Sequence, residues 1–70
     1  MSVEELREHG YWFVITADVW QVYHGEHVFI AGGTRIRGQP RHWRMTRQDI
    51  AEHTELARKA AAEHYREQHA

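Results

Sequence analysis

The chain has 70 residues, a mass of 8.4 kDa and a formal net charge of -1 at pH 7, which leaves room for one small domain. Apolar residues make up 41% and charged residues 27% of the chain, as in folded globular domains, so an intrinsically disordered chain is excluded. The chain contains no cysteine, which excludes disulfides and thiolate zinc sites, and no apolar run approaches the roughly 18 residues that cross a membrane.

The first expected element is a short helix over residues 3–9. Ser2 and Glu5 have the spacing of a capping box, in which the hydroxyl accepts from the Glu5 amide and the carboxylate accepts from the Ser2 amide. Gly10 suits the left-handed conformation that ends many helices. These residues predict both the start and the end of the helix.

Residues 11–37 are rich in aromatic and β-branched side chains and predict an antiparallel meander of three or four strands. We expect two-residue turns at Ala17-Asp18, His24-Gly25 and Gly32-Gly33. The last is the strongest, because two glycines tolerate the positive φ angles of hairpin turns. A fourth, shorter strand would then follow over residues 34–37.

These turns fix the register, because directly opposed residues on neighbouring strands share a face. One predicted face forms the core and contains Tyr11, Phe13, Ile15, Trp20, Val22, His27, Phe29, Ala31 and Ile36. The other contains Trp12, Val14, Thr16, Val19, Gln21, Tyr23, Glu26, Val28, Ile30, Arg35 and Arg37. A three-residue turn at residues 24–26 would exchange some members, yet both faces would stay apolar.

Residues 38–45 predict an irregular basic connector, because Gly38 and Pro40 interrupt regular structure. A helix capped by Thr46 is expected over residues 46–68. Its sheet-facing stripe at helical spacing contains Ile50, His53, Leu56, Ala57, Ala60, Ala61 and His64. At ~33 Å, this helix would exceed a compact domain of this size, so it would overhang, break or contact another chain.

The segment 48–57 resembles the first half of a helix-turn-helix DNA-binding motif, with Ala51 and Leu56 at the positions that the motif favours. Glu55 and His64 depart from the motif, because its turn usually has glycine and the later position is usually apolar. The resemblance implies a break within the C-terminal helix. A continuous helix accounts for the same residues.

Taken in order, the elements predict an α+β domain: a short N-terminal helix, an antiparallel sheet and a long C-terminal helix packed on one sheet face. A chain of 70 residues has a thin core, which favours self-association. The N-terminal sequence is acidic where a secretory signal is basic, so we expect a cytoplasmic protein.

Charge is concentrated in residues 34–47, which contain five arginines and no acid. Such a block commonly meets phosphate or carboxylate groups, and the acidic flanks of the same chain are an alternative partner. The seven histidines of the chain would gain charge below about pH 6. Binding to an acidic partner is therefore expected to tighten in mild acid.

Catalysis is not expected, because Ser2 is the only serine and the acids lie on solvated helix faces. A metal site needs three or four convergent ligands. His24 and His27 bracket a turn, whereas His53 and His64 lie ~16 Å apart along one helix and cannot share an ion. We therefore expect no catalytic residue, no cofactor, no metal and no small-molecule substrate.

The surplus of apolar sheet surface predicts a non-catalytic protein-interaction module, a regulator or inhibitor that binds a larger protein or itself as a homodimer. The expected contact residues are Trp12, Gln21, Tyr23, Val28, Arg35, Arg37, Arg41, Trp43, Arg44 and Arg47. In the alternative interpretation the five arginines bind nucleic-acid phosphates and Trp43 stacks on a base. In a third, structural interpretation, the N-terminal helix and the connector fold back over the second sheet face.

Overall fold

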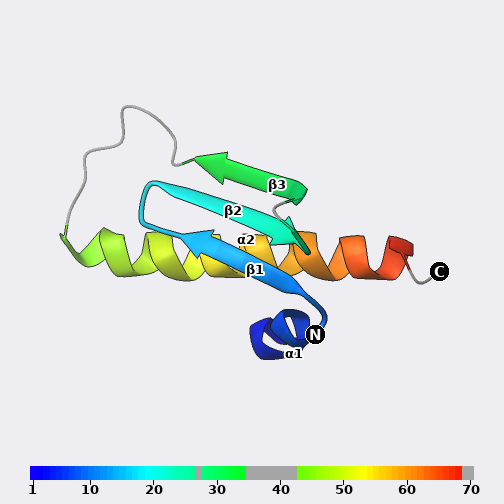
Figure 1. Cartoon of the computed structure of the whole chain (residues 1–70). Helices are drawn as coiled ribbons and strands as arrows, with labels where there is room; N and C mark the ends of the chain where they lie inside the picture. Colours follow the sequence, from blue (N-terminus) through cyan, green and yellow to red (C-terminus); the bar gives the residue numbers. More distant parts are fainter. Residues whose placement is uncertain (27, 35–42, 69–70) are drawn as a thin grey trace.

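The computed structural model describes residues 1–26, 28–34 and 43–68, with only the backbone described over 43–46. The elements are α1 (Val3–Glu8), β1 (Tyr11–Ile15), β2 (Val19–His24), β3 (Val28–Thr34) and α2 (Trp43–Gln68). The strands form one antiparallel sheet in the order β1-β2-β3, with α2 behind it and α1 beside β1 (Figure 1). The predicted α+β arrangement is confirmed.

The capping box of α1 forms as predicted. The Glu5 amide donates to the Ser2 hydroxyl at 3.1 Å, and the Ser2 amide donates to a Glu5 carboxylate oxygen at 3.3 Å. The Ser2 amide and the Ser2 hydroxyl, at 3.2 Å, both donate to this carboxylate, and they hold the pKa of the Glu5 carboxyl below its usual value. Gly10 follows the helix with a φ of +90°, the left-handed conformation expected there.

The strands β1 and β2 pair along their length in the predicted register. Their tight turn has no glycine, and Thr16 closes it instead. The Thr16 hydroxyl accepts from the amides of Asp18 and Val19 at 3.2 and 3.0 Å, and the Thr16 amide donates to the Val19 carbonyl at 2.8 Å. A side chain thus supplies the turn hydrogen bonds that this sequence needs.

The predicted turn at Gly32-Gly33 is wrong, because both glycines lie inside β3, opposite Gln21 and Trp20. Two rings occupy the space beside them. A Cβ on Gly33 would lie 2.6 Å from the Trp20 Nε1, and a Cβ on Gly32 would lie 3.1 Å from the Phe29 Cζ. The glycines therefore make room for aromatic side chains and do not reverse the chain.

The strands β2 and β3 also pair out of the predicted register. His24 lies opposite Val28, so the chain reverses over three residues and not over the two expected at His24-Gly25. The register then shifts between Val22 and Tyr23 of β2, where β3 has Ile30 as one extra residue. This irregularity is a β-bulge, which turns the side chains beyond it toward the other face.

The longer turn and the bulge exchange three side chains between the sheet faces. Phe29, predicted in the core, lies opposite Tyr23 on the face away from α2. Val28 and Ile30, predicted on that second face, lie on the side of α2 instead. Ile30 packs against the core, whereas Val28 remains 57% exposed at the start of its strand.

The C-terminal helix also begins earlier than predicted. Because α2 starts at Trp43, the predicted Thr46 cap is wrong, and residues 43–45 belong to the helix and not to the connector. Arginine and methionine favour helix, which accounts for the extension. The helix runs unbroken to Gln68, so the break implied by the helix-turn-helix resemblance does not occur. The predicted strand over 35–37 lies outside the described residues, as do His27 and residues 38–42.

Small side chains bring α2 close to the sheet. The buried core comprises Leu6, Tyr11, Val22, Ala57 and Ala61. Ile50 and Leu56, predicted in the same stripe, are 41% and 46% exposed. Leu56 points about 100° away from Ala57 around the helix, and Ala57 is the residue buried against the sheet.

Candidate interaction surface

The side of the sheet away from α2 has no helix over it among the described residues. We call it the outer face; it comprises Trp12, Val14, Val19, Gln21, Tyr23, Phe29, Gly32 and Thr34. None of these residues is an acid, a lysine, an arginine or a histidine. α1 does not cover this face, because its buried residue Leu6 packs into the core on the side of α2.

An aromatic row crosses the outer face, with one ring from each strand. The Trp12 and Tyr23 rings lie 5.3 Å apart at an interplanar angle of 39°, and the Tyr23 and Phe29 rings lie 5.7 Å apart at 72°. Offset and edge-to-face contacts of this kind are favourable for aromatic pairs. The row therefore forms one continuous apolar strip that spans the whole described sheet.

Much of this strip is accessible to solvent. Trp12 is 40%, Val14 38% and Phe29 56% exposed. Within the outer face, the Tyr23 hydroxyl donates to the Gln21 side-chain oxygen at 3.0 Å. The face thus offers apolar area without charge, which is the composition of the centre of a protein interface.

The structure brings together three of the predicted contact residues, Trp12, Gln21 and Tyr23. Val28 is excluded from the outer face by its pairing with His24. Arg47 lies on α2, on the opposite side of the sheet. Trp43 and Arg44 lie in the first turn of α2, and their side chains are outside the described part of the chain. The other predicted contact residues, Arg35, Arg37 and Arg41, lie outside the described residues.

Sequence reasoning missed Phe29, the most exposed ring of the row. Strict alternation from Val22 through a two-residue turn places this side chain in the core. The alternative three-residue turn would have placed it on the outer face. Beyond the bulge, Ala31 pairs with Val22 and Gly33 pairs with Trp20, as they would on the α2 side of the sheet. No local sequence motif predicts this bulge.

Two hydrogen bonds fasten α2 to the other side of the sheet, one near each end. His53 is buried, and its Nδ1 donates to the Thr16 carbonyl at 2.7 Å. The Tyr11 hydroxyl and the His64 Nδ1 lie 2.6 Å apart. Burial and the neighbouring Tyr65 raise the pKa of the Tyr11 phenol.

Further aromatic contacts surround this tyrosine. The His24 ring stacks on Tyr11 at 4.2 Å and meets the His64 ring edge-on at 5.4 Å. The His24 Nε2 donates to the His9 carbonyl at 3.1 Å, which fixes the ring. Tyr11 is 2% exposed, so its ring is enclosed by these neighbours. The cluster therefore fits a role in holding α1, β1, β2 and α2 together.

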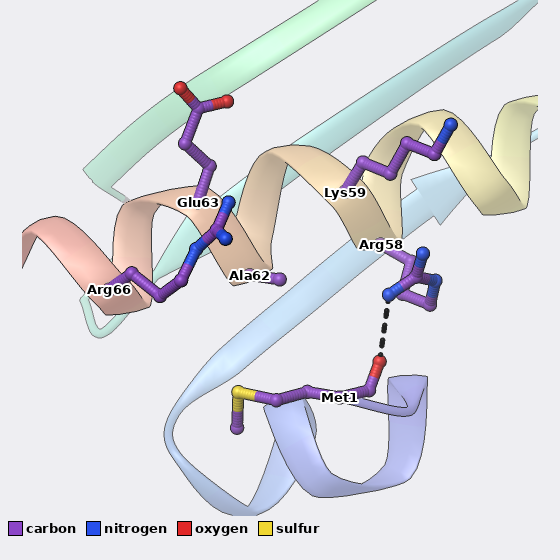
Figure 2. Close-up of a pocket in the computed structure, with 6 residues that line it drawn as sticks. All are labelled: Met1, Arg58, Lys59, Ala62, Glu63 and Arg66. Carbon is purple, nitrogen blue, oxygen red and sulfur yellow. Dashed lines mark hydrogen bonds between the residues drawn. The ribbon is translucent and has the colours of Figure 1, made fainter.

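An open depression lies between the chain start and α2 (Figure 2). It is lined by Met1, Arg58, Lys59, Ala62, Glu63 and Arg66. The Arg58 guanidinium is already engaged, donating to the Met1 carbonyl at 3.0 Å and to both carboxylate oxygens of Glu55 at 2.9 and 2.5 Å. This pairing lowers the pKa of the Glu55 carboxyl. The depression is open and carries side chains of both charge signs.

The part of the chain that the structure describes contains neither a metal-binding cluster nor a membrane-spanning helix. Within residues 1–26, 28–34 and 43–68, no group of three or more His, Asp or Glu side chains is arranged to hold a metal ion. No helix in those ranges is both long and apolar enough to cross a membrane. Comparison with protein-family models, with curated proteins and with solved structures found no match.

Proposed function

We propose that this chain is a small, non-catalytic interaction module that binds a protein through its outer face. The observation that supports this proposal is the exposed, uncharged aromatic row of Trp12, Tyr23 and Phe29. Interface centres are enriched in aromatic residues and depleted of charge. Contiguous apolar patches on monomers are uncommon unless they bind something.

The chemistry of the face favours a flat, apolar partner surface. Burial of exposed apolar area contributes about 25 cal/mol per Å², so the rings would supply most of the binding free energy. Because the Tyr23 hydroxyl already donates to Gln21, a partner need not supply a hydrogen-bond acceptor for it. Binding of a larger protein would make so small a chain a regulator or inhibitor of that protein.

Nucleic-acid binding remains the alternative prediction. It depends on the five arginines between residues 34 and 47 and on Trp43. The outer face itself has no cation with which to bind a backbone phosphate. The two functions therefore use different surfaces and different forces, which makes them separable by salt and by mutation.

Affinity capture from the native host with matched variants tests the proposal. The immobilised wild-type chain is compared with Trp12→Lys on the outer face and with Leu56→Lys on α2, where a side chain of similar exposure is changed in the same way. We expect the wild type and Leu56→Lys to retain the same protein after nuclease treatment and in 0.5 M salt. Trp12→Lys should lose it.

Two results would contradict the proposal. Equal capture by Trp12→Lys and by the wild type would exclude the outer face as the binding surface. Recovery of nucleic acid alone, with a steep loss of binding as salt rises, would favour the arginine-rich segment instead.

A further inference from the structure

We infer that the outer face binds the outer face of a second copy of this chain, an inference that rests on the proposed function and names its partner. Three features favour this occupant: the small interior of the monomer, the absence of charge on the described outer face, and the small area of the three-stranded sheet, over which a second sheet can stack.

The interior of one copy is small. Its buried apolar residues among those described are Leu6, Tyr11, Ala17, Val22, Ala57 and Ala61, and three of these six are alanines. Domains below roughly 70–80 residues usually add a disulfide, a metal or oligomerisation to such a core. The chain has no cysteine, and its described residues contain no metal-binding group. Oligomerisation is one device that would extend this small core.

The charge pattern suits an identical partner. When two copies meet about a two-fold axis, each residue approaches the same patch on the other copy, so a charged patch would repel itself. The outer face has no charged side chain, whereas residues exposed on α1 and α2 include Glu4, Glu8, Glu55 and Arg66. Among the described surfaces, the outer face is the extended one that can meet itself without like-charge contact.

The geometry suits sheet-on-sheet packing. Two sheets stack face to face about 10 Å apart with interdigitated side chains. Three strands of about six residues present a projected area of only ~300 Å² per copy, which is below the area that stable dimers bury. We therefore expect a weak, reversible dimer that forms only at high chain concentration.

Sedimentation velocity of the full chain from 1 to 500 µM tests the inference. The wild type is compared with Phe29→Lys and Val14→Lys, two separate changes on the outer face, and with Leu56→Lys as the matched change on α2. All three replaced side chains are already exposed to solvent, and circular dichroism checks that each variant folds. We expect the wild type and Leu56→Lys to dimerise with rising concentration and both outer-face variants to remain monomers.

The outcomes separate this inference from the proposed function. A wild type that stays monomeric at 500 µM overturns the second copy but leaves the outer face available for another protein, which the capture experiment with Trp12→Lys decides. A dimer that survives both outer-face changes also overturns the inference. If Leu56→Lys is the change that dissociates the dimer, the interface lies on α2.

Discussion

The same three strands present one face to α2 and the other to no described element. On the α2 side, Tyr11, Val22 and the helix residue Ala61 are buried. On the outer face, Trp12 and Phe29 remain accessible although they are about as large as or larger than Tyr11 and equally aromatic. Hydrophobicity alone therefore does not decide which residues are buried in this chain. The position of α2 and one extra residue in β3 decide it.

Two valines on opposite faces of the sheet should differ most in what they contribute to the free energy of unfolding. Val22 is fully buried, whereas Val14 is 38% exposed. Val22→Ala should lower the free energy of unfolding by about 2–3 kcal/mol, because it removes two buried methyl groups and leaves a cavity. Val14→Ala should cost less than about 1 kcal/mol. Urea denaturation at one low chain concentration measures both, and equal costs would refute the assignment of faces.

A glycine in β3 tests how tightly the α2 side is filled. Gly33→Ala places a Cβ against the indole of Trp20, which must move. We expect a loss of about 1–3 kcal/mol, as for other additions to a packed site. The Trp20 indole N–H resonance in an NMR spectrum should shift strongly. An unchanged resonance together with unchanged stability would show that the indole lies elsewhere.

Two tyrosine hydroxyls, one on each side of the sheet, should differ in how much their hydrogen bonds stabilise the fold. Tyr11→Phe removes the buried partner of His64 and should cost about 1–2 kcal/mol. Tyr23→Phe removes a hydroxyl on the outer face, where water can replace it for Gln21, and should cost less than about 1 kcal/mol. Thermal unfolding of both variants ranks them. The reverse order would contradict the burial assigned to Tyr11.

Alkaline pH should lower the free energy of unfolding through Tyr11, which lies on the α2 side of the sheet. Because burial raises the pKa of the Tyr11 phenol, the folded chain keeps this proton at pH values where the unfolded chain has lost it. The associated stability is complete below the unfolded value of about 10 and declines as pH rises through the folded value. Urea midpoints between pH 8 and 11 should therefore fall, and Tyr11→Phe should reduce that fall. An identical slope in the variant would exclude Tyr11 as the source.

Local signals predicted the parts of the fold that depend on neighbouring residues. The capping box at Ser2, the left-handed Gly10 and the register of β1 against β2 all follow from a few adjacent side chains. The helical stripe is also correct for His53, Ala57 and Ala61, which are buried. Each of these features is determined within one turn or one helical period.

The incorrect predictions concern features that depend on distant contacts. Gly32-Gly33 has the sequence of a turn, yet the space that Trp20 and Phe29 occupy keeps it extended. Nothing near Ile30 in the sequence marks a bulge. The sequence places five of the eight outer-face residues on this face, Trp12 and Tyr23 among them, whereas Phe29 required the strand pairing itself.

The bulge at Ile30 has a consequence for uncontrolled assembly. β3 lies at the edge of the described sheet, where unpaired backbone groups can recruit further strands and seed fibrils. A bulge increases local twist and interrupts the regular spacing of those groups. The bulge thus makes the β3 edge a poor template for open-ended strand addition, whichever partner the outer face binds.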